Sequence, residues 1–160
     1  MNVIGTDDSR VEAEFAALYR ATHGRIVRYA ARRIGPADAE DVAAEVFRIA
    51  WTRTAEGVDV TTGWLFVTAE NVVRNHLRSA ARAHRLHAPP PTNDTVPDDD
   101  VLDALDRLDD ATRNLLMLRY WDELSGAELA QTLGISPSAV WVRLHRARRA
   151  FRSTYGKAPS

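Results

Sequence analysis

Apolar residues recur at intervals of three and four along most of the chain, and no stretch alternates between apolar and polar positions as a strand does. This spacing predicts amphipathic helices. In the first half we expect one long helix or two within residues 10–34, a helix over 35–51 and a helix over 64–86. Gly35 and Pro36 mark the first boundary, because glycine commonly ends a helix and proline suits a first turn.

A segment rich in proline and aspartate, residues 87–100, interrupts the helical pattern. Its four prolines and four aspartates cannot build a packed core, so it predicts a flexible linker. The linker divides the chain into two predicted domains, residues 10–86 and 101–155. One or two helices are expected over 101–124, and two more follow. The expected fold class is all-α, with two small helical domains.

The last part of the chain carries the local signals of a helix-turn-helix. Ser125 followed by Glu128 predicts a capping box, and Gly134 supplies the left-handed residue that ends a helix. Ser136 is expected to cap the next helix. The inward side of that helix is predicted to consist of Val140, Leu144, Ala147 and Phe151. A short helix, a glycine-containing turn and a basic helix are typical of proteins whose second helix enters the major groove of DNA.

Charge is segregated along the chain, although the net charge is only −1. Residues 140–157 hold six basic residues and residues 71–87 hold four arginines, both without an acid. Residues 94–110 hold eight aspartates and one arginine. Local patches, not the total charge, set the field that a polyanion meets. Two basic helices therefore indicate two contacts with DNA. The alternative is that the arginines only solvate amphipathic helices.

The outward side of the second helix of the helix-turn-helix carries candidate DNA-binding residues. Phosphate contacts are expected from Arg148, Arg149 and Arg152, and base contacts from residues nearer the start of the helix. The candidates for this site are Ser136, Ser138, Trp141, Val142, His145, Arg146 and Arg149.

Composition and motifs argue against several other classes of function. The chain has no cysteine, which excludes disulfides and thiolate metal sites. Its five histidines have no metal-ligand spacing, and no nucleophile motif or glycine-rich phosphate loop is present. We therefore expect no enzyme, metal, cofactor or small-molecule substrate. No apolar run could span a membrane and no secretory signal is visible, so a cytoplasmic protein without membrane insertion is expected.

Four segments together are similar to a known family. They are FAALYRATHGRIVRYAARRIG, DAEDVAAEVFRIAW, WLFVTAENVVRNHLR and LDDATRNLLMLRYWDELSGAELAQTLGISPSAVWVRLHRAR. Their order and spacing resemble those of bacterial extracytoplasmic-function (ECF) sigma factors over residues 12–86 and 101–152. The resemblance implies a subunit of RNA polymerase that binds the core enzyme and directs promoter recognition, DNA melting and initiation. Such a subunit is not itself an enzyme.

The resemblance also implies roles for the two domains. Residues 10–86 are similar to sigma region 2, which would bind core RNA polymerase and the −10 element of promoter DNA. Residues 101–155 are similar to region 4, which would bind the −35 element. The implied polymerase-binding residues are Asp38, Asp41 and Glu45, whose charge also suits any helix N-terminus. The implied −10 residues are Asp59, Thr61, Thr62, Asn71, Arg74, Asn75, Arg78 and Arg82. An anti-sigma factor is an expected partner.

Three features depart from the family pattern. Glu70 stands where many members have a basic residue. Trp141 and Val142 stand where the recognition helix usually has a basic and then a small polar residue, and they offer apolar surface that suits a thymine methyl group. The loop before the third helix is short and lacks a frequent Gly-Asp-aromatic run. The family's usual −35 preference is therefore not carried over.

A free-standing helix-turn-helix regulator is the alternative function. It would bind a specific duplex without polymerase, and it would leave the basic helix over residues 64–86 without a role.

Overall fold

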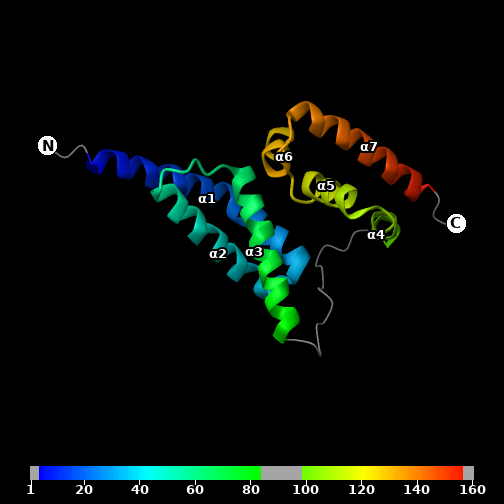
Figure 1. Cartoon of the computed structure of the whole chain (residues 1–160), viewed down its shortest axis with the longest axis horizontal. Coiled ribbons are helices and arrows are strands. Elements are labelled where there is room, and N and C mark those ends of the chain that lie inside the picture. Colours follow the sequence, from blue (N-terminus) through cyan, green and yellow to red (C-terminus); the bar gives the residue numbers. More distant parts are fainter. Residues whose placement is uncertain (1–3, 84–98, 157–160) are drawn as a thin grey trace. The chain divides into compact units, whose positions relative to one another are not determined.

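The structure, a computed structural model, describes residues 4–83 and 99–156, and every element in them is an α-helix (Figure 1). The expected all-α fold class is therefore confirmed. By their contacts the residues fall into two units, Met1–Thr92 and Asn93–Ser160. The predicted linker, residues 87–100, lies outside the described residues except where the second unit's first helix begins.

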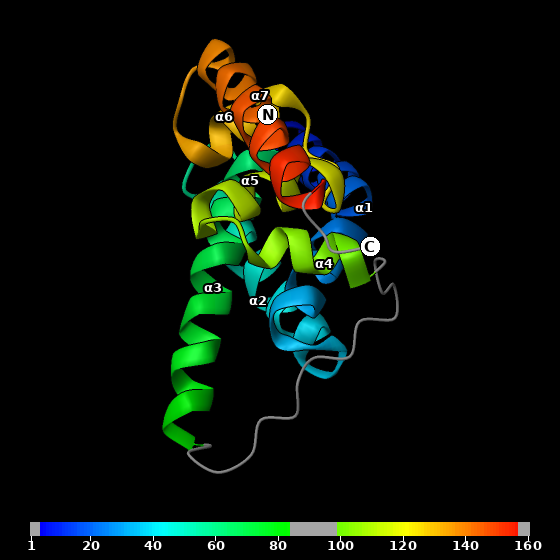
Figure 2. The same cartoon turned by 90° about the vertical axis from the view of Figure 1, so that its right-hand side faces the viewer.

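Three helices form the first unit. They are α1 (Ile4–Ile34), α2 (Pro36–Ala55) and α3 (Thr62–Ala83). After Gly35 the chain turns back so that α2 runs along α1, and α3 packs against both (Figures 1 and 2). Because α1 is continuous, residues 10–34 form part of one helix and not two.

The core of the first unit lies where these helices face one another. Ile26 of α1, Val46 of α2 and Leu65 of α3 are fully buried. Phe66 is buried beside them, and its ring meets the ring of Tyr29 edge to face at 5.5 Å. Burying each such aliphatic or aromatic side chain contributes roughly 1.5–3 kcal/mol. This packing decides which faces of α2 and α3 remain outside.

Four helices form the second unit. They are α4 (Asp99–Asp106), α5 (Asp110–Tyr120), α6 (Gly126–Leu133) and α7 (Pro137–Tyr155). All of the first three pack on α7, and α5 also contacts α6. Asp109 separates α4 from α5, because its carboxylate caps α5 by accepting a hydrogen bond from the Thr112 amide at 2.7 Å. Two helices therefore cover most of residues 101–124.

The predicted helix-turn-helix signals are confirmed. The Ser125 hydroxyl accepts a hydrogen bond from the Glu128 amide at 3.1 Å, and the Glu128 carboxylate accepts one from the Ser125 amide at 3.0 Å. Gly134 has a φ of 66°, and the Ser136 hydroxyl accepts a hydrogen bond from the Ala139 amide at 3.2 Å. The inward side of α7 consists of Val140, Leu144 and Ala147, which are buried, and Phe151, which is half-buried.

Replacing Gly134 with Ala is expected to destabilise the second unit by about 1–2 kcal/mol. No heavy atom lies within 4 Å of the new Cβ, so the cost comes from the left-handed backbone alone. Urea unfolding followed by circular dichroism measures this loss. Gly24→Ala is the control, because Gly24 lies inside α1 and alanine should stabilise that helix by up to about 1 kcal/mol. Stabilisation by both substitutions would contradict the prediction.

Candidate nucleic-acid and protein interfaces

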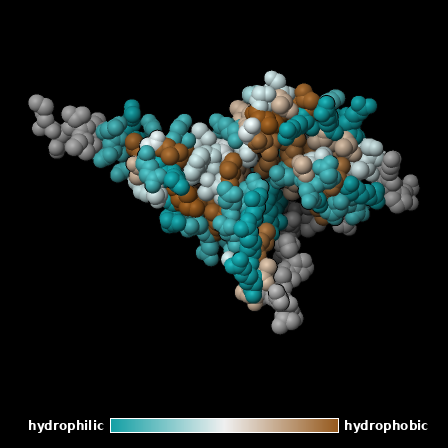
Figure 3. Space-filling view, in the orientation of Figure 1, coloured by the Kyte–Doolittle hydropathy of each residue, from teal (hydrophilic) through white to brown (hydrophobic). Residues whose placement is uncertain are grey.

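One side of α3 is polar and exposed. Leu65, Phe66, Ala69 and Val73 are buried and form the opposite side. Five of the predicted −10 residues on α3 are exposed, and their helical spacing places them on one face of the helix. They are Asn71, Arg74, Asn75, Arg78 and Arg82. We call these five residues the α3 strip, and α3 is largely hydrophilic on the side visible in Figure 3. The structure thus brings together five of the six predicted −10 residues of this helix, and the sixth, Thr62, lies in its first turn.

Glu70 lies one turn before Arg74 and is bound to it. The Arg74 guanidinium donates a hydrogen bond to the Glu70 carboxylate at 2.7 Å, and both side chains are about half exposed. Such an exposed pair contributes little to stability, but it neutralises one positive charge of the α3 strip. Residues 71–87 contain no acid, but Glu70 lies just before them, and its four-residue spacing from Arg74 is a sequence signal for an ion pair.

The loop before α3 holds the other predicted −10 residues. The Thr61 hydroxyl accepts a hydrogen bond from the Trp64 amide at 3.2 Å, so this side chain caps the start of α3. Asp59 is exposed, and Thr62 is half-buried in the first turn. The loop and Phe15 of α1 line a hollow of about 360 Å³. A contact between the loop and a DNA base stays a prediction.

The three predicted polymerase-binding acids share one face of α2. Asp38, Asp41 and Glu45 are spaced by three and four residues, and none of them is buried. The opposite side of the helix is buried and consists of Ala39, Val42, Ala43, Val46, Phe47 and Ala50. We call the three acids the acidic face of α2.

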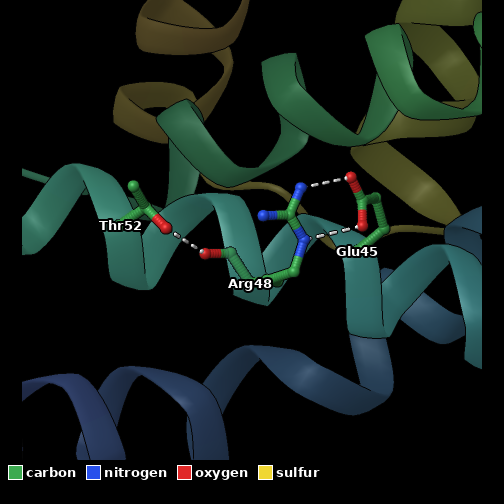
Figure 4. A network of polar contacts seen from close by, with 3 residues as sticks. All are labelled: Glu45, Arg48 and Thr52. Atoms are coloured by element: carbon green, nitrogen blue, oxygen red, sulfur yellow. Dashed lines mark hydrogen bonds and ion pairs between the residues drawn. The ribbon is translucent and has the colours of Figure 1, made fainter.

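Two of these acids have basic neighbours within the unit. The Asp38 carboxylate lies 3.3 Å from Nε2 of His76, which joins α2 to α3. The Glu45 carboxylate accepts hydrogen bonds of 2.9 and 2.7 Å from Arg48, and this bonding lowers the pKa of Glu45 (Figure 4). No ion pair within residues 4–83 involves Asp41, which is exposed. Asp41 therefore offers the least neutralised charge of the acidic face.

The predicted −35 residues are exposed at the start and on the outward side of α7. They are Ser136, Ser138, Trp141, Val142, His145, Arg146 and Arg149. From Ser138 onward their spacing places them on one face, opposite the buried Val140 and Leu144. We call the seven residues the α7 face. Trp141 and Val142 are 50% and 51% exposed, which is unusual for large apolar side chains.

Comparison with known proteins identifies the family. The family model Sigma-70 region 2 matches residues 18–83, and the model Sigma-70, region 4 matches residues 98–151. The chain is 32% identical to the ECF RNA polymerase sigma factor SigL of Mycobacterium tuberculosis, over 91% of this chain and 93% of that one. It is 30% identical to SigK, an ECF sigma factor of Mycolicibacterium vanbaalenii, over 90% and 83% of the two chains.

The chain belongs to the ECF RNA polymerase sigma factors. The resemblance inferred from the sequence is thereby confirmed. Sigma factors bind core RNA polymerase and direct it to promoters, and they are not a class of enzymes.

Solved sigma factor structures have a similar fold. CnrH, in complex with the cytosolic domain of CnrY, matches with a TM-score of 0.61 and 26% identity over 92% of this chain and 91% of that one. The sigma factor RpoE of Bartonella quintana, in complex with the anti-sigma factor NepR, matches with a TM-score of 0.58 over 91% and 99% of the two chains. At 18% identity, the second match shows the fold alone.

Arg148 of this sigma factor is turned away from the α7 face. Its Nε donates a hydrogen bond to the Tyr120 hydroxyl at 2.5 Å, which joins α7 to α5. The expected phosphate contact therefore suits Arg149 and Arg152, which are exposed, better than Arg148. No local pattern signals a contact between residues this far apart in the sequence.

Within residues 4–83 and 99–156, no cluster of three or more histidine, aspartate or glutamate side chains is arranged to hold a metal ion. In the same residues, no helix combines the length and the apolar character needed to cross a bilayer.

Replacing Glu70 with Gln is expected to raise the affinity of the sigma factor–polymerase complex for promoter DNA roughly threefold at low salt. Glutamine removes the charge that neutralises Arg74, so one more arginine can meet a phosphate. The slope of log K against log salt should steepen by up to about 0.9. Anisotropy titrations at several salt concentrations measure both effects. Glu56→Gln is the control, since Glu56 pairs with Arg53 at the end of α2. Equal gains from both variants would contradict the prediction.

Proposed function

We propose that this sigma factor binds core RNA polymerase through the acidic face of α2 and promoter DNA through the α3 strip and the α7 face. The observation that carries the proposal is that each unit presents an exposed helix face that carries arginines, opposite a buried side. The two faces belong to the parts that match regions 2 and 4. This match supports the proposed roles of residues 10–86 and 101–155.

The α3 strip has the composition that binding to the −10 element requires. Arg74, Arg78 and Arg82 would bind the DNA backbone, because guanidinium groups form charge-assisted hydrogen bonds with phosphates. Asn71 precedes these arginines and Asn75 lies between Arg74 and Arg78. Both asparagines would hydrogen-bond to base edges that are exposed when the strands separate. Asp59, Thr61 and Thr62 would lie near a captured base.

The α7 face would read the −35 element as duplex DNA. Ser136, Ser138 and His145 offer hydrogen-bonding groups for the backbone or base edges, and Arg146 and Arg149 offer guanidinium groups. Arginine contacts to phosphates supply affinity without sequence preference. Each of the two DNA contacts would be weak alone, and binding to polymerase would join them by raising the effective concentration of the second contact.

Regulation of this sigma factor is proposed to act through a protein partner. CnrH, which is 26% identical, is bound by the cytosolic domain of CnrY in its structure. We extend this to an anti-sigma factor that competes with core polymerase for the present chain. Both partners would be met in the cytoplasm, and no step would require the chain to be an enzyme or to carry a cofactor.

Co-elution with bacterial core RNA polymerase, followed by run-off transcription from genomic fragments, tests the proposed function. We expect a stable complex and start sites that core polymerase alone does not use. A chain that fails to bind core polymerase, but binds one duplex tightly alone, would overturn the proposal. It would favour the free-standing helix-turn-helix regulator instead.

A further inference from the structure

The indole ring of Trp141 lies against Gly126, at the start of the neighbouring helix α6. A Cβ atom added to Gly126 would lie 3.0 Å from Cζ2, 3.3 Å from Cε2 and 3.6 Å from Nε1 of Trp141. The first two distances are tighter than ordinary van der Waals contact, so a side chain at residue 126 would displace the ring by a few tenths of an ångström. The absent side chain of Gly126 thus forms a notch that holds one edge of the indole.

This contact determines which part of the indole is turned to solvent. Nε1, the only hydrogen-bond donor of the side chain, is among the three ring atoms nearest to Gly126. Trp141 remains 50% exposed, so its outward surface is mainly ring carbon. Val142 follows on the same face and is 51% exposed. The two residues therefore form an apolar step on the α7 face, with its position fixed by α6.

The apolar step can read few features of duplex DNA. It has no acceptor, and Nε1, its one donor, lies beside Gly126, so most of its surface cannot hydrogen-bond to the edges of guanine, adenine or cytosine. The one apolar group that an unmodified base presents in the major groove is the C5 methyl group of thymine. His145 and Arg146 lie next along the helix and can hold the backbone or a neighbouring base.

We infer that Trp141 and Val142 select thymine in the −35 element through its methyl group, and that Gly126 is the positioning residue for this selection. The inference rests on the proposed role of the α7 face in DNA binding. It adds the chemical group that is recognised and a residue outside the recognition helix that controls recognition. An apolar step of this kind could also contact a protein. Binding to DNA and binding to a protein partner predict different effects of Trp141→Ala.

Replacing single thymines with deoxyuridine removes only the methyl group and tests the inference directly. The duplex is chosen by selecting randomised −35 sequences with the sigma factor bound to core polymerase. For the unchanged protein, we expect at least one −35 thymine whose replacement weakens binding about fourfold, as expected for losing one buried methyl group. In Trp141→Ala or Val142→Ser, the same replacement should change binding by less than about 1.5-fold. Tyr155→Ala, which removes another half-exposed aromatic of α7, should keep the fourfold ratio.

The role of Gly126 is tested by filling the notch. Gly126→Ala and Gly126→Val should lower the thymine-to-deoxyuridine ratio step by step, because each larger side chain moves the indole further. In the Trp141→Ala background, the same substitutions should leave the ratio unchanged, which shows that they act through the ring. Alanine also favours a helix over glycine, so loss of folding does not explain the effect. Circular dichroism checks that each variant is folded.

Three results would overturn the inference. Deoxyuridine could have no effect at any −35 position while the start sites are unchanged, in which case the sigma function stands and methyl recognition is wrong. The thymine-to-deoxyuridine ratio could be unchanged in Gly126→Val, which would show that Gly126 does not position Trp141 for recognition. Trp141→Ala could leave DNA selection intact but abolish binding of a purified anti-sigma factor, which would assign the apolar step to a protein partner.

Discussion

Replacing Asp41 with Arg will weaken the binding of this sigma factor to core RNA polymerase by roughly 100-fold. Asp41 is exposed at the centre of the acidic face of α2, and no ion pair within the described part of the first unit involves it. Its full charge is therefore available to a basic partner surface. Reversing the charge removes this attraction and places like charges opposite each other, which costs several kcal/mol at an interface.

Asp41 gives a clearer result than the two other acids. Substituting Asp38 also removes its contact with His76 and so disturbs the packing of α3 on α2. Substituting Glu45 also releases Arg48, which then presents a positive charge of its own. Neither side effect arises at Asp41, so a change in binding there reports on the interface alone.

Fluorescence anisotropy with labelled sigma factor and core polymerase measures the effect of Asp41→Arg. The control is Glu12→Arg, which reverses an exposed acid on α1 and should change the affinity less than about threefold. The urea unfolding curve of each variant should match that of the unchanged protein. Binding by Asp41→Arg within threefold of the unchanged protein would exclude the acidic face of α2 as the docking surface.

The parts of the fold that sequence reasoning predicted well depend on local signals. Ser125 and Glu128 are three residues apart, and a capping box needs no information from elsewhere in the chain. The φ of Gly134 follows in the same way from its place after a helix. The exposed side of α3 was predictable because the buried side repeats with helical spacing. These signals also placed the DNA-binding candidates on two helix faces.

The contacts that sequence reasoning missed join different helices. Trp141 meets Gly126, Arg148 binds Tyr120, and His76 contacts Asp38. Each contact depends on how two helices cross, which the spacing along one helix does not specify. Such contacts determine which side chains of a site are available to a partner, but they do not change which helix carries the site. They turn Arg148 away from the α7 face and give Asp38 a partner, while both residues stay on the predicted helices.

Replacing Arg78 with Glu will reduce the formation of open promoter complexes by roughly 100-fold. Arg78 is exposed in the middle of the α3 strip, and no ion pair within residues 4–83 involves it. A charge-assisted hydrogen bond to a phosphate contributes about 1.5–3 kcal/mol, and a carboxylate at the same place would repel the strand. Arg74 already pairs with Glu70, so Arg78 is expected to matter more than Arg74.

Permanganate reactivity of unpaired thymines measures open complexes, and binding to core polymerase is measured in parallel. The Arg78→Glu variant should form few open complexes but should still bind core polymerase with unchanged affinity. The control is Arg20→Glu, which reverses an exposed arginine on α1 and should leave both unchanged within about threefold. Equal losses of melting in the two variants would show that total charge, and not the α3 strip, governs opening.

Arg78→Lys then distinguishes between a phosphate and a base as the partner of Arg78. Lysine keeps the charge but loses the planar guanidinium that binds two acceptors at once. If Arg78 binds a phosphate, Lys should restore open complexes to within about tenfold of the unchanged protein and should keep the salt dependence. If Arg78 reads a base, Lys should remain as defective as Glu at the preferred −10 sequence and should lose the preference between sequences. The α3 strip also contains two asparagines, which offer base-specific hydrogen bonds themselves, so we expect the phosphate result.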